Sequence, residues 1–266
     1  MNKKIVTLLT DFGLTDSYVA EMKAVILSIC PNVTIIDISH VIAEYNIRMG
    51  AYLLARSVEY FPLGTIHVAV VDPGVGGPRK PILVETNKGF LVGPDNGLLM
   101  LAAEKQGIKH VYKIENKKYM LPKISETFHG RDIFAPTAAY LALGIPPQEF
   151  GKEVFDYVKP SFSEPKIQKN KIFGEIIHID HFGNLVTNIK PELLYEKKVE
   201  YGSHLKIALG KRKPVKTVFL RTYSEAPQGK ILVMVGSGDF IEISANLANA
   251  AKLLNAKIGM KIILIL

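Results

Sequence analysis

A carboxylate and a guanidinium flank a dense run of turn-forming residues in the stretch VVDPGVGGPRK, which ends at Lys80. Asp72 directly follows the apolar run Ile66–Val71, and Arg79 comes seven positions after Asp72. Because the glycines and prolines between them favour a tight turn over a helix, Arg79 can return to the point where the strand ends. This pattern indicates either a reactive edge of an α/β sheet or a capped turn with a surface ion pair.

Further polar side chains follow other predicted strand ends and turns, where α/β sheets hold their ligands. His129 in TFHGRD completes, with Asp72 and Arg79, a carboxylate–guanidinium–imidazole set that suits the positioning and deprotonation of water. Each residue also has a structural alternative, since a lone histidine can be structural and an aspartate can cap a helix or shape a hairpin. The other candidates are Asp11, Asp16, Asp95, Asn96, Arg131, Asp132, Asp180, His181, Asn184 and Ser237.

Several common kinds of site do not fit this sequence. The glycines after Asp72 do not form G-x-G-x-x-G, and Gly-Lys-Ser/Thr is absent, which disfavours a dinucleotide or phosphate loop. The histidines are isolated in sequence and form neither His-x-His nor His-Glu-x-x-His, which argues against a metal site. Ser237 lies in VGSGD rather than in the G-x-S-x-G elbow of a hydrolase. We therefore expect neither a metal nor another cofactor.

Apolar runs and helical periodicities predict two domains. Up to Val71 the order is strand, helix, strand, helix, strand, which is typical of a parallel sheet with right-handed crossovers. A hairpin over 82–92 follows, and then a helix over 131–143 that tolerates Pro136 only early or with a kink. The C-terminal part has short apolar runs separated by turn residues, as in a small antiparallel barrel or sandwich.

The predicted fold class is therefore α/β. An N-terminal domain over 1–157 has a mostly parallel sheet flanked by helices, and a smaller antiparallel β domain occupies 171–266. The stretch 158–170 holds two prolines and few apolar residues, and is the predicted linker. The chain has 266 residues, 48% of them hydrophobic, which is enough for two cores.

Composition and charge exclude further classes of protein. The single cysteine, Cys30, rules out an intramolecular disulfide. No apolar run is long enough for a signal peptide or a membrane span, so we expect a soluble, cytoplasmic protein. The net charge of +8 is concentrated in the C-terminal part, and its densest cluster is a Pro-containing turn without interleaved aromatics. A solvated turn is favoured over nucleic-acid binding; its basic residues are Lys211, Arg212, Lys213 and Lys216.

Six spaced motifs carry a family resemblance. TDFGLTDSYV, VDPGVGGPR, GPDNG, TFHGRDIFAP, IDHFGNLVTNI and VGSGDFIEISAN occur in this order along essentially the whole chain. In this set the sequence resembles the S-adenosyl-L-methionine (SAM) hydroxide adenosyltransferases, or SAM hydrolases, which are relatives of the SAM-dependent fluorinating and chlorinating enzymes. The resemblance implies an α/β domain followed by an antiparallel β domain, in a homotrimer that binds SAM between neighbouring subunits.

The resemblance also implies roles for individual residues. Asp72, Arg79 and His129 match the Asp–Arg–His triad of the hydrolases. Asp11 matches the carboxylate that accepts hydrogen bonds from both ribose hydroxyls. The remaining implied substrate contacts are Tyr45 near the ribose, Asp16, Asp180 and Ser237 at the methionine end, and Asn184 and Phe182 at adenine.

The implied reaction is attack by water on the ribose 5′ carbon, which yields adenosine and L-methionine without a cofactor. Halogenation is the nearest alternative, but halogenating relatives carry Tyr at the position of Asp72 and Ser at that of Gly130, and the fluorinating ones have an additional loop. Two of their contacts are also absent, at Tyr18 and Ala245. A SAM- or adenosine-binding sensor without turnover, and a nucleic-acid-binding protein, are the alternatives from other classes.

Overall fold

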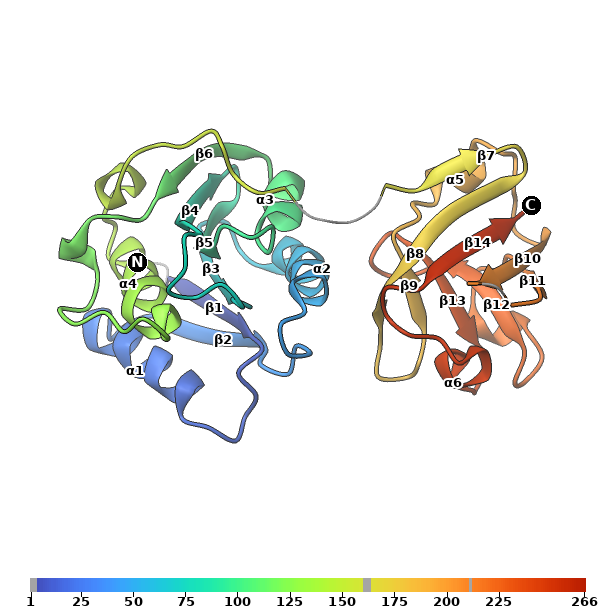
Figure 1. The fold of residues 1–266 in the computed structure, drawn as a ribbon, viewed down its shortest axis with the longest axis horizontal. Coiled ribbons are helices and arrows are strands. Elements are labelled where there is room, and N and C mark those ends of the chain that lie inside the picture. Colours follow the sequence, from blue (N-terminus) through green and yellow to red (C-terminus); the bar gives the residue numbers. More distant parts are fainter. Residues whose placement is uncertain (1–3, 160–163, 211) are drawn as a thin grey trace. The chain divides into compact units, whose positions relative to one another are not determined.

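The computed structural model describes residues 4–159, 164–210 and 212–266. The chain divides into two compact units, Met1–Ser161 (unit 1) and Phe162–Leu266 (unit 2), which Figure 1 shows as separate folds.

Unit 1 is built on one six-stranded sheet of order β2-β1-β3-β5-β4-β6. The first four strands of this order are parallel, and β4 pairs antiparallel with both β5 and β6. The mostly parallel sheet and the hairpin over 82–92 are thereby confirmed. The strands are β1 (Ile5–Thr10), β2 (Thr34–Ser39), β3 (Thr65–Val70), β4 (Pro81–Thr86), β5 (Gly89–Pro94) and β6 (Ile108–Lys113).

Helices cover both faces of this sheet, which explains why its central strands β1 and β3 are buried at nearly every position. Val68 and Val70 belong to one core, with α1 and α4, whereas Ala69 and Val71 belong to a second core with α2 and α3. The alternation follows from the two-residue period of a strand. The helices are α1 (Tyr18–Ile29), α2 (Ile47–Ser57), α3 (Met100–Gln106) and α4 (Ala135–Ala142), and the shorter turns are η1 (Val58–Tyr60), η2 (Lys117–Tyr119), η3 (Gly130–Phe134) and η4 (Pro147–Phe150).

Two local details of unit 1 depend on contacts between neighbouring turns. Ser17 is the N-cap residue of α1 but makes no capping hydrogen bond, because its hydroxyl donates to Glu21 Oε1 instead (2.6 Å). The predicted helix over 131–143 is helical over nearly its whole length, and consists of one π-turn, η3, followed directly by α4. Pro136 is accommodated in the first turn of α4, where its missing N–H costs no helical hydrogen bond.

Unit 2 is a nearly closed antiparallel sheet of order β11-β10-β14-β8-β9-β13-β12, and β7 pairs with β8 outside this path. A bridge between Phe219 and Val233 brings the two ends of the sheet together around an apolar core. The antiparallel C-terminal fold is confirmed. The strands are β7 (Lys166–Gln168), β8 (Lys171–Ile179), β9 (Leu185–Thr187), β10 (His204–Leu209), β11 (Val215–Val218), β12 (Ile231–Val235), β13 (Ile241–Ala245) and β14 (Lys261–Ile265), with α5 (Glu192–Tyr195), η5 (Tyr223–Glu225) and α6 (Ala250–Leu254) between them.

The C-terminal part of the predicted linker 158–170 is a strand rather than a connection. Residues 160–163 lie outside the described residues, but Lys166–Gln168 form β7. Ile167, the single apolar residue of β7, packs against the core of unit 2, and this contact holds the strand in place. A three-residue strand carries too short an alternation to be read from sequence.

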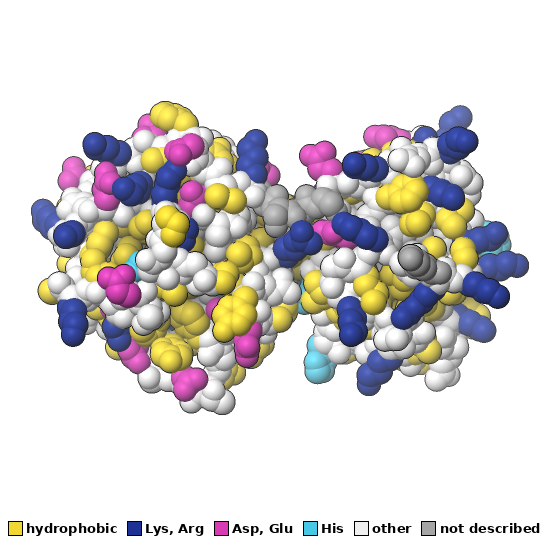
Figure 2. All heavy atoms as spheres, in the orientation of Figure 1, with side chains coloured by type: hydrophobic (Ala, Val, Ile, Leu, Met, Phe, Trp, Pro, Cys, Tyr) yellow, Lys and Arg dark blue, Asp and Glu magenta, His cyan; other side chains and the backbone are white. Residues whose placement is uncertain are grey.

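Charged side chains are dispersed over both units on the face shown in Figure 2. Of the predicted basic turn in the C-terminal part, Lys211 lies outside the described residues, and Arg212 and Lys213 are exposed. Lys216 is exposed too, but it lies on strand β11 and not in the turn. Among the described helices, none is both long enough and apolar enough to cross a membrane.

A buried histidine in the sheet should make the stability of unit 1 depend on pH. His67 on β3 is 1% exposed, its Nδ1 lies 2.8 Å from Thr7 Oγ1, and burial lowers its pKa to about 4. Between about pH 4 and 6.5 the unfolded chain therefore binds the proton and the folded chain does not. The stabilisation by neutral His67 is complete above pH 6.5 and is lost as the pH falls toward 4.

We expect His67→Gln, which keeps a hydrogen-bonding group for Thr7 and cannot titrate, to flatten this dependence. Between pH 7 and pH 4.5, the free energy of unfolding from urea denaturation should fall by about 2 kcal/mol more in the wild type than in the variant. Equal slopes for the two proteins would contradict the assignment.

Candidate active site

Asp72, Arg79 and His129 form one hydrogen-bonded cluster in unit 1. Arg79 donates from Nε to Asp72 Oδ1 (3.0 Å) and from Nη2 to Asp72 Oδ2 (2.5 Å), which is a bidentate pair. Nη2 also lies 2.8 Å from His129 Nδ1. The side chains of Arg79 and Asp72 are only 10% and 4% exposed, so this is not a surface ion pair.

The loop after β3 brings these side chains together. Its backbone folds in two tight turns, closed by hydrogen bonds from Val75 N to Asp72 O and from Gly77 N to Gly74 O. Gly76 has φ +73°, and a Cβ at this position would lie 2.3 Å from the carbonyl oxygen of Glu126. Glycine is therefore required, because the loop packs directly on the backbone of the segment that leads to His129.

The hydrogen bond from Arg79 fixes the tautomer of His129. A guanidinium has donors only, so Nδ1 of His129 must accept, and the neutral imidazole then carries its proton on Nε2. Burial, followed by the Arg79 cation, lowers the pKa of His129, which keeps the ring neutral at neutral pH. Phe134 supports the cluster, with its ring centre 5.5 Å from the Arg79 guanidinium carbon.

A pocket of about 400 Å³ opens beside this cluster, within the size range of small-molecule sites. Five of the candidates from the sequence line it, and they come from four separate segments of unit 1. An aromatic wall of Phe12, Tyr18 and Phe128 packs edge to face, with ring centres 5.2–5.8 Å apart. The candidates that line the pocket are Asp11, Asp16, Tyr45, Asp72 and His129.

Asp11 is held by the backbone of Tyr45, whose N–H donates to Asp11 Oδ2 at 2.9 Å. Tyr45 adopts φ 61°, a left-handed conformation that is costly for an aromatic residue and is found mainly at functional sites. Burial raises the pKa of Asp11, although the Tyr45 N–H opposes this, and the nearby Asp72 and Glu44 carboxylates raise it further. Because a carboxylate has about four acceptor positions, Asp11 keeps acceptors for a ligand beyond its backbone hydrogen bonds.

The candidates in unit 2 lie in two turns. Asp180 Oδ1 accepts from the backbone N–H of Phe182 and Asn184, and Asp180 Oδ2 accepts from Asn184 Nδ2 at 2.9 Å. These residues therefore shape the turn between β8 and β9, the structural alternative noted for them, and leave the Phe182 side chain 74% exposed. Ser237 follows β12, in the turn that leads to β13.

Several pocket residues were not among the candidates from sequence. Phe12 and Phe128 are direct neighbours of Asp11 and His129, and this adjacency is the one signal that could have pointed to them. Glu44 has no comparable signal, because it reaches the pocket only through the turn before Tyr45. In the part of the chain that the structure describes, no group of three or more His, Cys, Asp or Glu side chains could hold a metal ion.

Comparison with known proteins places this geometry in a family. Residues 6–151 match the family model for the SAM hydroxide adenosyltransferase N-terminal domain, and residues 174–263 match that for the C-terminal domain. The chain belongs to the SAM hydroxide adenosyltransferase family.

Individual members of this family support the assignment over the full length. An (R)-S-adenosyl-L-methionine hydrolase from Methanocaldococcus jannaschii is 42% identical over 260 residues, which are 94% of this chain and 92% of the relative. A crystal structure of an uncharacterized conserved protein from Thermotoga maritima superimposes with a TM-score of 0.93 at 37% identity, covering 98% of this chain and 100% of that chain. A fluorinase from Actinoplanes sp. is less similar, at 28% identity over 97% of this chain and 96% of the relative.

Proposed function

We propose that this protein hydrolyses SAM to adenosine and L-methionine by in-line attack of water on the ribose 5′ carbon. The observation that carries the proposal is the Asp72–Arg79–His129 cluster, with its largely buried ion pair, at the edge of a pocket that Asp11 also lines. The hydrolase from M. jannaschii, with 42% identity, supports the same chemistry and points to the R epimer of the sulfonium.

The bond changes balance without a cofactor. The water oxygen forms a bond to C5′ while the C5′–S bond breaks, and the electron pair of the C5′–S bond goes to sulfur. Methionine therefore leaves as a neutral thioether that needs no general acid. The attacking water becomes acidic as its bond to carbon forms, so a nearby base must accept one proton.

We assign this proton to Asp72 rather than to His129. The Nδ1 lone pair of His129 is occupied by the Arg79 hydrogen bond, and Nε2 carries the proton of the neutral ring. His129 can then donate a hydrogen bond to the water but cannot take its proton. Each carboxylate oxygen of Asp72 keeps a lone pair beyond its bond to Arg79, and so can accept it.

The other candidates would hold the substrate. We propose that Asp11 accepts from the ribose hydroxyls and that Tyr45 packs near the ribose, both in the pocket of unit 1. The methionine-end and adenine contacts would come from Asp16, Asp180, Ser237, Asn184 and Phe182. Unit 2 supplies four of these five residues. In line with the family resemblance, we also propose that the protein is a cytoplasmic homotrimer in which each site takes its C-terminal residues from a neighbouring subunit. Light scattering should then give three times the mass of one chain.

Asp11→Asn tests the ribose contact. The amide oxygen of asparagine can still accept the Tyr45 N–H, but its NH₂ group cannot accept from a ribose hydroxyl. We therefore expect KM for SAM to rise about tenfold or more, the cost of one charge-assisted hydrogen bond, while kcat falls less than KM rises. A change in kcat alone, measured from initial rates, would contradict this role.

Product analysis tests the proposed function. Incubation with (R)-SAM, followed by chromatography, should give adenosine and methionine in equal amounts, and chloride or fluoride should not change the products. A 5′-halo nucleoside would instead identify a halogenase, and tight adenosine binding with no methionine release would identify a sensor. Either result would overturn the proposal.

A further inference from the structure

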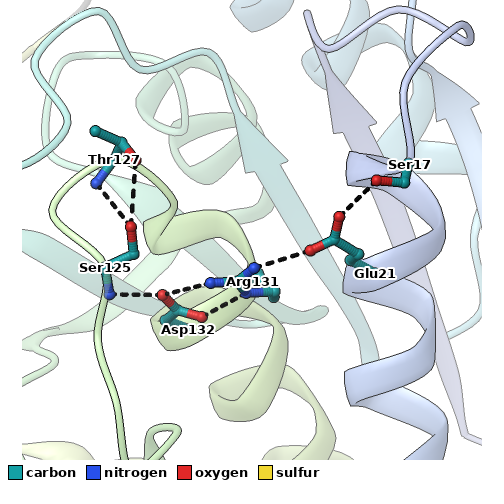
Figure 3. A network of polar contacts seen from close by, with 6 residues as sticks. All are labelled: Ser17, Glu21, Ser125, Thr127, Arg131 and Asp132. Atoms are coloured by element: carbon teal, nitrogen blue, oxygen red, sulfur yellow. Dashed lines mark hydrogen bonds and ion pairs between the residues drawn. The ribbon is translucent and has the colours of Figure 1, made fainter.

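A charged bridge joins two of the segments that line the pocket of unit 1 (Figure 3). Glu21 lies in the first turn of α1, and its Oε2 accepts from Arg131 Nη1 at 2.8 Å. Its Oε1 accepts from Ser17 Oγ at 2.6 Å. Arg131 belongs to the π-turn η3, two positions after His129. The bridge therefore ties the start of α1 to the turn that begins directly after His129.

Asp132 extends this bridge to a third segment. Its side chain is 0% exposed, and it accepts from Arg131 Nε at 2.7 Å and from Arg131 Nη2 at 3.2 Å. It also accepts from the backbone N–H of Ser125 at 2.7 Å. Ser125 Oγ in turn accepts from the backbone N–H of Thr127, which lines the pocket. One guanidinium thus connects α1, η3 and the irregular segment before His129.

The same guanidinium lies against the aromatic wall of the pocket. The Arg131 guanidinium carbon is 4.8 Å from the centre of the Phe128 ring, which packs edge to face on Tyr18 at 5.2 Å. Glu21, Arg131 and Asp132 themselves are not among the residues that line the pocket. Any effect that they have on a bound substrate must therefore act through Tyr18, Phe128 and His129.

We infer that Glu21, Arg131 and Asp132 are positioning residues for the reaction, which hold His129 and the start of α1 at a fixed separation across the pocket. This inference rests on the proposed function. A π-turn is a local irregularity that occurs frequently at functional sites. Here His129, directly before the π-turn, contacts Arg79. Within the turn, Arg131 hydrogen-bonds to Glu21, and Asp132 accepts from the backbone N–H of Ser125. A displacement of about 1 Å in an active site can lower a rate about 10²-fold, whereas an exposed ion pair adds little to stability.

Glu21→Ala, compared with Glu21→Gln, tests this inference. The alanine variant removes the acceptor for Arg131, and we expect kcat to fall at least about fivefold with little change in Tm. The glutamine variant keeps an acceptor oxygen and should restore kcat to within about twofold of the wild type. Glu59→Ala is the matched control, because Glu59 is 35% exposed like Glu21, pairs with Lys105 at 2.6 Å, and lies outside the pocket lining; its kcat should not change.

The ¹⁵N chemical shifts of the His129 imidazole provide a readout that does not depend on turnover. We expect them to change in Glu21→Ala and to stay unchanged in Glu59→Ala. An unchanged kcat together with unchanged His129 shifts in Glu21→Ala would overturn the inference. If the wild type formed no adenosine, the proposed function would fail, and the His129 shifts would still decide whether the bridge positions this side chain.

Discussion

Asp72→Asn is expected to lower kcat for SAM hydrolysis about 10³-fold, within the range for loss of a general base. Asparagine is close in size to aspartate and its amide oxygen can still accept one bond from Arg79, so the loop can keep its shape. Its amide cannot take the proton of the attacking water. Initial rates of adenosine formation under saturating SAM measure the effect.

The control for this variant is the affinity for the substrate. Because Asp72 contacts the water and not SAM in our scheme, KM for SAM, from initial rates at varied SAM concentration, should stay within about twofold of the wild type. If kcat fell less than tenfold, Asp72 would not be the base, and the tautomer argument for His129 would be wrong.

Arg79→Lys is expected to lower kcat about 10²-fold. A lysine ammonium keeps the positive charge, but it is a compact point charge that cannot span both oxygens of Asp72 and also reach His129 Nδ1. The carboxylate then loses its fixed orientation and the imidazole loses the partner that sets its tautomer. Steady-state kinetics should show the loss in kcat with a smaller change in KM.

Lys80→Ala is the matched control for Arg79→Lys, since Lys80 is the adjacent cation and pairs with the exposed Asp156 at 2.6 Å. Its kcat should match that of the wild type. Retention of more than about half of the wild-type kcat in Arg79→Lys would show that charge alone suffices, and would refute a geometric role for the guanidinium fork.

Most of the fold could be predicted from local sequence patterns. The apolar run before Asp72 is rich in β-branched residues and is followed by turn-forming residues, and it forms a strand that ends one residue before the predicted end. The return of Arg79 to Asp72 also follows from local chemistry, because prolines restrict the backbone of the loop and glycines permit its tight turns. The strand β7 and the π-turn η3 could not be predicted, since each depends on tertiary contacts: Ile167 on the core of unit 2, and Asp132 on Ser125.

The electrostatic detail of the site lies beyond sequence for the same reason. Spacing can suggest that a histidine joins a carboxylate and a guanidinium, but only the distance from Arg79 Nη2 to His129 Nδ1 assigns the tautomer. Likewise, Ser17 matches the pattern of an N-cap, and its hydroxyl is diverted because Glu21 lies one turn away. Which of several possible hydrogen-bond partners a side chain takes depends on distances in the folded protein, and these distances cannot be read from the spacing of residues in the sequence.

Turnover of (R)-SAM in ¹⁸O-labelled water tests the central claim most directly, with the products resolved by mass spectrometry. Our account predicts one ¹⁸O atom in adenosine, at the 5′ oxygen, none in methionine, and loss of the labelled product in Asp72→Asn. Unlabelled adenosine, or label in a product derived from the methionine chain, would contradict attack by water on the ribose 5′ carbon.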